Sequence, residues 1–188
     1  MLCYNQRMNP EKITESVGFP DIKKEITAMT KVDQDMRESD EWGDSVDRNH
    51  TQRMKEVVEE IGWPTVSKVG AQAAEEAWLL VQHADLDVAF QKHCLELMKA
   101  EPESEVSVIN IAYLTDRICV NSGLGQVYGT QFRQIDGAHV PCPIEDAGAI
   151  DQRRAEIGIG PLSEQTQIMY DKYGTPVITK SEADNEKG

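Results

Sequence analysis

The chain has 188 residues, of which 39% are hydrophobic and 28% charged, the balance of an ordinary globular protein of one domain. Its 33 acidic and 19 basic residues give a formal net charge of −14. Phosphate backbones and anionic membranes are bound through lysine and arginine, so we expect neither nucleic acid nor a membrane as a partner. A small anion can still bind where arginines gather locally.

The cysteines and histidines are spread too widely to form a familiar metal or disulfide motif. Cys3, Cys94, Cys119 and Cys142 contain no CxxC pair, which is typical of reduced thiols in a cytoplasmic protein. The four histidines show neither HxxxH nor HExxH. We therefore expect no cofactor and no metal, while a mixed His/Asp metal site assembled from distant segments stays open.

The first predicted elements are two helices. Residues 1–18 are expected to form a flexible N-terminal arm, and a helix begins at Pro20 with Ile22, Ile26, Met29 and Val32 on its apolar face. After a polar stretch, Asp47 is expected to cap a second helix that runs to Ile61. That helix would bury Met54, Val57, Val58 and Ile61 and end at Gly62.

Three further helices are predicted between residues 71 and 121. An alanine-rich helix ends at His83, and the next would bury Phe90, Cys94, Leu97 and Met98 before Pro102. The strongest predicted helix covers about 105–121.

A β-hairpin and one short helix are expected to complete the domain. Residues 126–134 and 138–144 alternate around Asp136-Gly137, a good hairpin turn. A last helix over 149–157 ends at Gly158, and residues 175–188 form a flexible acidic tail. The predicted fold is mainly α, a single compact helical domain over 19–174 with five or six helices and one small β-hairpin.

Two acidic residues stand where a polar site is expected. Asp116 follows Ile109 and Tyr113 at helical spacing, so it interrupts an apolar seam, with Arg117 beside it. His83 and Asp85 would bring an imidazole and a carboxylate into one tight turn, which could poise a general acid or base near neutral pH. A structural ion pair for Asp116 and a helix N-cap for Asp85 are the alternatives.

Three other segments carry polar side chains suited to a ligand. Residues 126–131 alternate as in a strand, with Gly129 allowing a close approach of ligand or backbone. Arg153-Arg154 is the only adjacent pair of arginines in the chain and could hold an anion, or pair with neighbouring acids. Arg37 lies one turn after Asp33, which is most often a surface pair.

The motif series resembles one known family. DQDMR at 33–37, GWPT at 62–65, HAD at 83–85, AYLTDR at 112–117, QVYGTQ at 126–131 and DQRR at 151–154 resemble, in order and spacing, the DUF6624 family, a domain of unknown function. The resemblance covers about residues 21–162 and carries no established reaction. It implies a shared set of candidate site positions: Gln34, Arg37, His83, Asp85, Gln91, Asp116, Arg117, Gln126, Tyr128, Thr130, Gln131 and Arg153.

These residues lead to one main functional hypothesis and two alternatives. We expect a small cofactor-independent enzyme, of hydrolase or lyase type, that acts on a small polar and anionic metabolite. His83 would be the general acid or base, oriented by Asp85 or Asp116, while Arg117 and Arg153 hold the anionic group and Gln126, Tyr128 and Gln131 fix its orientation. One alternative is a non-enzymatic acidic protein that is partner-binding, immunity-type or ligand-sensing. The other is a metal-dependent hydrolase.

Overall fold

The computed structural model describes residues 17–39, 43–135 and 138–174. Apart from residues 17 and 18, the predicted arm and tail lie outside these ranges, and so does the Asp136-Gly137 turn. The described part is mainly α, as predicted. Its elements are α1 (Pro20–Glu38), α2 (Asp44–Ile61), α3 (Val66–Val69), α4 (Ala71–Gln82), α5 (Val88–Ala100), α6 (Val108–Asn121), β1 (Phe132–Ile135), β2 (Ala138–Pro141), a 3₁₀ turn η1 (Ala147–Ala149), α7 (Ile150–Glu156) and α8 (Leu162–Tyr173).

The described residues thus form eight α-helices, more than the five or six predicted. Helix α3 is a single turn, too short to show a periodic pattern. Helix α8 buries no residue, so it has no apolar stripe to recognise. The predicted hairpin is confirmed: β1 pairs with β2 in antiparallel register, with Phe132 opposite Pro141.

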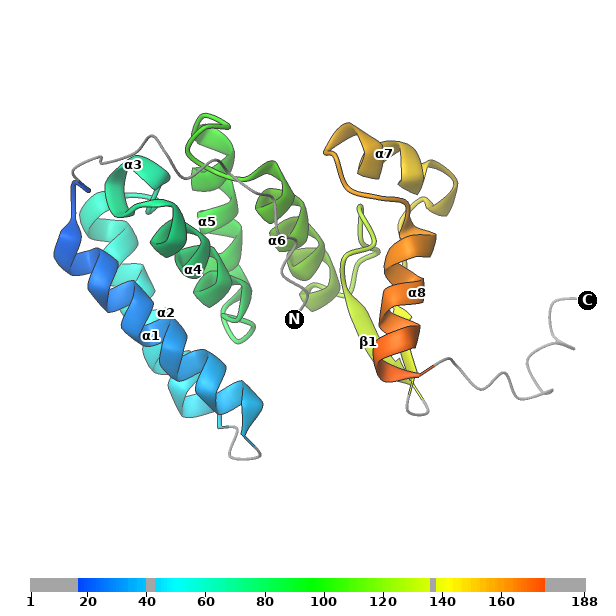
Figure 1. The fold of residues 1–188 in the computed structure, drawn as a ribbon, viewed down its shortest axis with the longest axis horizontal. Coiled ribbons are helices and arrows are strands. Elements are labelled where there is room, and N and C mark those ends of the chain that lie inside the picture. Colours follow the sequence, from blue (N-terminus) through cyan, green and yellow to red (C-terminus); the bar gives the residue numbers. More distant parts are fainter. Residues whose placement is uncertain (1–16, 40–42, 136–137, 175–188) are drawn as a thin grey trace, which may run out of the picture.

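The elements form two unequal parts, and α6 is the helix of the larger part that lies next to the smaller one (Figure 1). Helices α1 to α6 form a bundle in which α1 and α2 pack on α4, and α5 packs on α6. All members of its apolar core, among them Ile26, Met54, Val81 and Leu114, come from this part of the chain. The hairpin, α7 and α8 form the smaller part, where α8 packs on β2. No helix in the described ranges is long and apolar enough to cross a membrane.

The first two helices differ from the prediction in register and start. In α1 the buried face is Ile22, Ile26, Thr30 and Asp33, and Val32, expected on that face, is 45% exposed. Helix α2 begins at Asp44 after Gly43, so the prediction that Asp47 is its cap was wrong. The rest of the second helix is confirmed: its predicted apolar face is buried, and Gly62 ends it at a φ of +69°.

The segment before the hairpin is a loop, not a strand. Residues 126–131 contain only an isolated bridge between Gln126 and Ile144, so the predicted strand alternation was wrong. At Gly129, φ is +68°, and a Cβ would come within 2.8 Å of Ile150 Cδ1 and 2.9 Å of Leu162 Cδ1. The absent side chain makes room for α7 and α8, whose apolar groups pack there against the loop.

Candidate functional site

His83 stands at the C-terminal end of α4, in contact with a buried carboxylate of α1. Its ring atom Nδ1 lies 2.9 Å from Asp33 Oδ2 and 3.1 Å from Oδ1, and Asp33 is 2% exposed. An ionised carboxylate can only accept, so Nδ1 carries the hydrogen. The opposite nitrogen, Nε2, is left as the acceptor of the neutral ring and has no partner among the described residues.

The structure corrects the expected partner of His83. Sequence reasoning named Asp85 or Asp116 as the residue that orients the ring, and the bond goes to Asp33 instead. The pair of Asp33 and Arg37 was expected at the surface, because the apolar stripe of α1 was placed through Val32, but Asp33 is buried. Ile22, Ile26, Thr30 and Asp33 are spaced by four, four and three, which is also a helical face. This spacing is the sequence signal that could have found the carboxylate.

Asp33 is fixed by two further donors on its own helix. Arg37 Nε donates to Oδ1 at 3.0 Å and Gln34 Nε2 donates to Oδ2 at 2.7 Å. Burial raises the pKa of Asp33, but the hydrogen bond and charge of His83, together with Arg37 and Gln34, outweigh it and leave the pKa below its ordinary value. The predicted site residues Gln34 and Arg37 therefore support the carboxylate that holds His83.

The same corner contains a second acid and a second histidine. Arg37 Nη2 donates to Asp47 Oδ1 at 2.9 Å. Burial raises the pKa of Asp47, since the nearby charge of Arg37 does not offset it. Burial lowers the pKa of His50, whose Nδ1 is buried without a hydrogen-bond partner in the part of the chain that the structure describes. The ends of α1, α2 and α4 thus gather two histidines, two carboxylates and one arginine.

Asp85 joins the turn after His83 to α6. Arg117 Nε donates to Asp85 Oδ1 at 2.8 Å, and Arg117 Nη2 donates to the other oxygen, which makes the pair bidentate. Asn121 Nδ2 also donates to Oδ1, at 2.8 Å. Burial raises the pKa of Asp85, but the bond and charge of Arg117 outweigh it, so the pKa lies below its ordinary value. The cap of α5 is Asp87, which accepts from Phe90 N, so a capping role for Asp85 was wrong.

Gln91 and Gln131 extend this pair on both sides. Gln91 is fully buried, and its amide donates to Val81 O at 3.2 Å and Gln82 O at 3.3 Å, the last carbonyls of α4. Arg117 Nη1 donates to Gln131 Oε1 at 3.2 Å. The Arg117 side chain remains 30% exposed, and two of its five N–H groups are not used by these bonds.

Asp116 holds the loop 126–131. It is fully buried, and its two oxygens accept from Val127 N at 2.7 Å, Tyr128 N at 2.9 Å, Thr130 N at 2.9 Å and Thr130 Oγ1 at 2.9 Å. Burial of Asp116 was predicted correctly. Its acceptor positions are occupied by N–H and hydroxyl groups of the loop, so it acts as a structural lock, although not through the ion pair that was the alternative expected from the sequence.

Gln126 and the two arginines of α7 fix the same loop from its other sides. Gln126 Nε2 donates to Gln131 O at 3.0 Å and Cys142 O at 2.8 Å, and its Oε1 accepts from Gln131 N at 2.8 Å. Arg153 Nε donates to Val127 O at 2.8 Å, and Arg154 Nη1 donates to Tyr128 O at 2.6 Å. The two arginines bind carbonyl groups of the loop, whereas Asp116 binds its N–H groups.

The twelve predicted positions therefore fall into two groups. The first contains His83, with Gln34 and Arg37 bound to its partner Asp33, and Asp85 two residues further on, which bonds to Arg117 and Gln91. Around Asp116 lie Gln126, Tyr128, Thr130 and Arg153. Gln131 connects the groups, because it bonds to Arg117 and donates to Thr130 Oγ1 at 3.0 Å. Arg154, 2% exposed, was not among the predicted site residues although it binds the loop as closely as Arg153.

The described residues contain no group of three or more histidine, cysteine, aspartate or glutamate side chains placed to hold a metal ion. Three of the cysteines are described and are free thiols, and burial raises the pKa of Cys94 to about 12.

The fold and these contacts define a class: a mainly α domain with an Asp–His pair at the end of α4 and, on α6, a buried carboxylate that holds a loop. The chain belongs to the DUF6624 family, a family of unknown function, whose sequence profile matches residues 20–178. The match extends past residue 162, where the motif resemblance was expected to end, and includes α8. No protein with a curated description and no solved structure matches the chain.

Proposed function

We propose that the protein is a cofactor-independent acid–base enzyme in which His83 transfers the proton and Asp33 orients its ring. The observation that carries the proposal is the 2.9 Å contact between His83 Nδ1 and the buried Asp33 carboxylate. Such a bond selects one tautomer and stabilises the imidazolium that forms when the ring takes a proton at Nε2. The His83 side chain is 15% exposed, which leaves the ring edge within reach of a small molecule.

Arg117 is the residue we propose for the anionic group of the substrate. It binds Asp85, which stands two residues after His83 in the same turn. Arg117 also keeps two N–H donors beyond these bonds, and its side chain is partly exposed. Three carboxylates, Asp33, Asp47 and Asp85, surround the site, so the local field disfavours a multiply charged anion. We therefore propose a small polar substrate with one carboxylate or comparable group, processed by hydrolysis or elimination in the cytoplasm.

The decisive variants exploit the two nitrogens of histidine. His83→Asn keeps a donor close to the position of Nδ1, and so the bond to Asp33, but removes Nε2. His83→Gln keeps a polar group near Nε2 and loses the bond to Asp33. A panel of small carboxylate esters, amides and β-hydroxy acids, assayed with a chelator present, should contain a substrate that the wild type turns over. We expect His83→Asn to lose at least about a hundredfold in kcat, the usual contribution of a general acid or base.

Two results would refute the acid–base role. Turnover that survives in His83→Asn would remove the histidine from the chemistry, and turnover abolished by the chelator would favour the metal-dependent alternative. Asp33→Asn is the positioning control. It should lower kcat, because the ring loses the carboxylate that fixes its tautomer and orientation.

A non-enzymatic binding protein is the second candidate, and one observation favours it. Asp116, Gln126, Thr130 and Arg153 spend their polar atoms on internal contacts of the loop rather than on an open site. A partner-binding protein needs no reactive centre, only a rigid surface. If no panel compound is turned over while the wild type retains a ligand or partner on purification, this second function replaces the first.

A further inference from the structure

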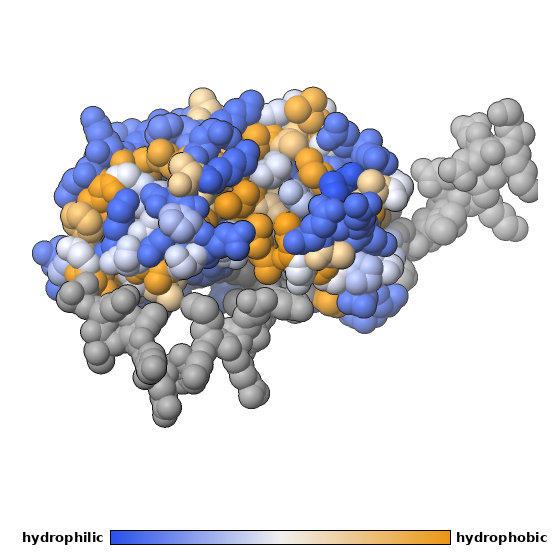
Figure 2. Space-filling model, turned by 90° about the horizontal axis from the view of Figure 1, so that it is seen from above, coloured by the Kyte–Doolittle hydropathy of each residue, from blue (hydrophilic) through white to orange (hydrophobic). Residues whose placement is uncertain are grey.

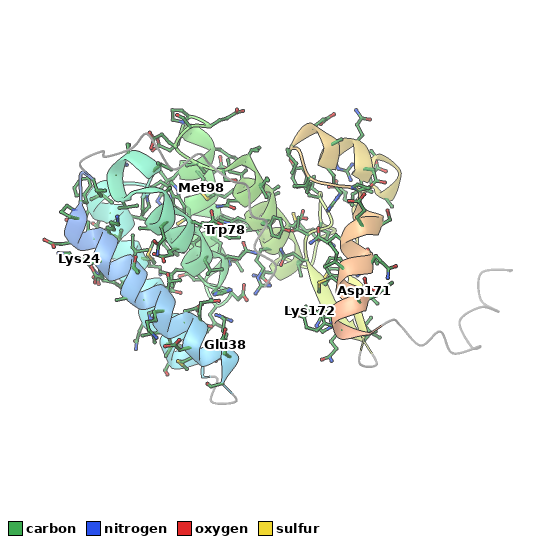
Figure 3. The ribbon with its side chains drawn as sticks, in the orientation of Figure 1. Lys24, Glu38, Trp78, Met98, Asp171 and Lys172 are labelled. Atoms are coloured by element: carbon green, nitrogen blue, oxygen red, sulfur yellow. The ribbon has the colours of Figure 1, made fainter. Side chains whose placement is uncertain are left out.

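A groove on the bundle lies apart from His83 and has a consistent chemistry. It has a volume of about 390 Å³, within the range of small-molecule sites, and lies between α3, α4 and residues 103–110, with Ile157 after α7 at its edge. Trp63, Val66, Ala74, Trp78 and Met98 line it. Figure 2 shows hydrophobic surface along the middle of this upper face, bordered by hydrophilic residues, and Figure 3 labels Trp78 and Met98 in the bundle below it.

The charged residues of the groove all have one sign. Glu75, Glu103 and Glu105 line it, and no lysine, arginine or histidine of the described ranges does. Glu105 accepts from Ser67 N at 2.8 Å, and this bond, which outweighs the effect of burial, lowers its pKa. The charge of Lys68 acts on Glu105 from outside the groove, but no cation among the described residues lines it beside Glu75 and Glu103, so this wall is complementary to a positive ligand.

Asn110 is a fixed polar group in this wall. It is 8% exposed, and its side-chain Nδ2 donates to Glu75 Oε2 at 2.6 Å. Its main-chain carbonyl oxygen accepts from Trp78 Nε1 at 3.0 Å. Donation through Nδ2 fixes the amide orientation, so Oδ1 is an acceptor with no partner among the described residues. The Trp78 ring is held further by an edge contact with Tyr113, at 6.2 Å between ring centroids.

We propose that this groove binds a small organic ammonium ion with an apolar body. The ammonium group donates to Glu75 and to Asn110 Oδ1, and the apolar body packs on Val66, Ala74 and Trp78, which line the groove and are partly exposed. An indole face attracts a cation, and the effect is strongest where water is excluded, as in a groove with this floor. Carboxylate-bearing molecules are repelled by the three glutamates, so this site and the His83 site take ligands of different charge.

The test uses three probes of similar shape and different charge. Benzylamine, cationic at neutral pH, benzyl alcohol and benzoate are titrated separately against the full chain, with tryptophan fluorescence as the readout. We expect benzylamine to bind at least about tenfold more tightly than benzyl alcohol, and benzoate not to bind. Glu75→Gln keeps an acceptor for Asn110 and should weaken benzylamine binding by about tenfold.

Glu60→Gln is the matched control, because Glu60 is an exposed glutamate of α2 outside the groove. It removes the same charge and should leave the affinity unchanged. The proposal fails if benzylamine gives no signal up to about 10 mM, if benzyl alcohol binds equally well, or if Glu75→Gln binds benzylamine as the wild type does. His83 variants should not alter this binding, so its outcome is independent of the acid–base proposal.

Discussion

Two buried aspartates, Asp33 and Asp116, perform different tasks with the same carboxylate. Asp33 accepts from three side chains, one of them the histidine His83, and lies at an edge of the bundle where that histidine is partly exposed. Asp116 accepts mainly from backbone N–H groups of a loop and is fully buried. Burial on a helix face is common to both. What distinguishes the proposed reactive corner (Asp33, Arg37, Asp47, His50 and His83) from the structural lock is that Asp33 holds a histidine whose second ring nitrogen has no partner among the described residues.

The largest expected effect comes from breaking the lock. Asp116→Asn places an amide donor against donors of the loop and leaves buried N–H groups unpaired, so we expect a loss of about 3–5 kcal/mol in the free energy of unfolding. Urea denaturation measures it. Thr130→Val removes one donor to Asp116 and the acceptor of Gln131 Nε2, and it should cost about 1–2 kcal/mol. Similar losses in the two variants would mean that the backbone bonds of Asp116 contribute little.

A second variant tests how tightly the loop is packed. Gly129→Ala combines a positive φ with contacts under 3 Å to side chains of α7 and α8, so we expect a loss of about 1–3 kcal/mol. Gly158→Ala is the control, because Gly158 has a φ of +74° but nothing within 4 Å of an added Cβ. Its cost should be about 1 kcal/mol, from backbone strain alone. Equal costs would show that the loop can move away from Ile150 and Leu162.

The pH dependence of the free energy of unfolding distinguishes Asp33 from Asp47, the two acids of the proposed reactive corner. The pKa of Asp33 lies below its ordinary value of 3.8, so its ionised form stabilises the folded state above that pH, and the contribution is lost as the pH falls further. The pKa of Asp47 is raised, so its ionisation weakens the fold as the pH rises through this region. The cost of Asp33→Asn, about 1–3 kcal/mol at neutral pH, should therefore shrink on acidification.

The same series with Asp47→Asn should change in the opposite direction: its cost relative to the wild type falls as the pH rises from about 3 to 7. Denaturation midpoints across this range measure both variants. Parallel curves for the two variants would contradict the assigned environments of Asp33 and Asp47.

Much of this comparison could be predicted from the sequence, and the failures have physical causes. The helical fold, the hairpin, the face of α2 and the burial of Asp116 follow from periodicity within one element. The Asp33–His83 bond joins residues 50 positions apart, so it depends on how α1 packs on α4. A shift of one residue in reading α1, from Asp33 to Val32, was enough to hide it.

The loop 126–131 could not be predicted for a related reason. Its alternating residues favour a strand, but alternation does not reveal which groups will bind the backbone. Here the backbone groups are bound by Asp116 from α6 and by the arginines of α7 instead of a neighbouring strand. Asp85 shows the same competition. Two aspartates near the turn could cap α5, and Asp87 does so while Arg117 pairs with Asp85.

The central claim is that His83 belongs to a reactive corner and not to the frame of the protein. The free energy of unfolding of His83→Asn, measured by urea denaturation beside Asp116→Asn, tests it most directly. We predict a loss below about 1 kcal/mol, because asparagine keeps the donor to Asp33 and the side chain at this helix end is partly exposed. A loss as large as that of Asp116→Asn would make His83 a second lock and contradict the account.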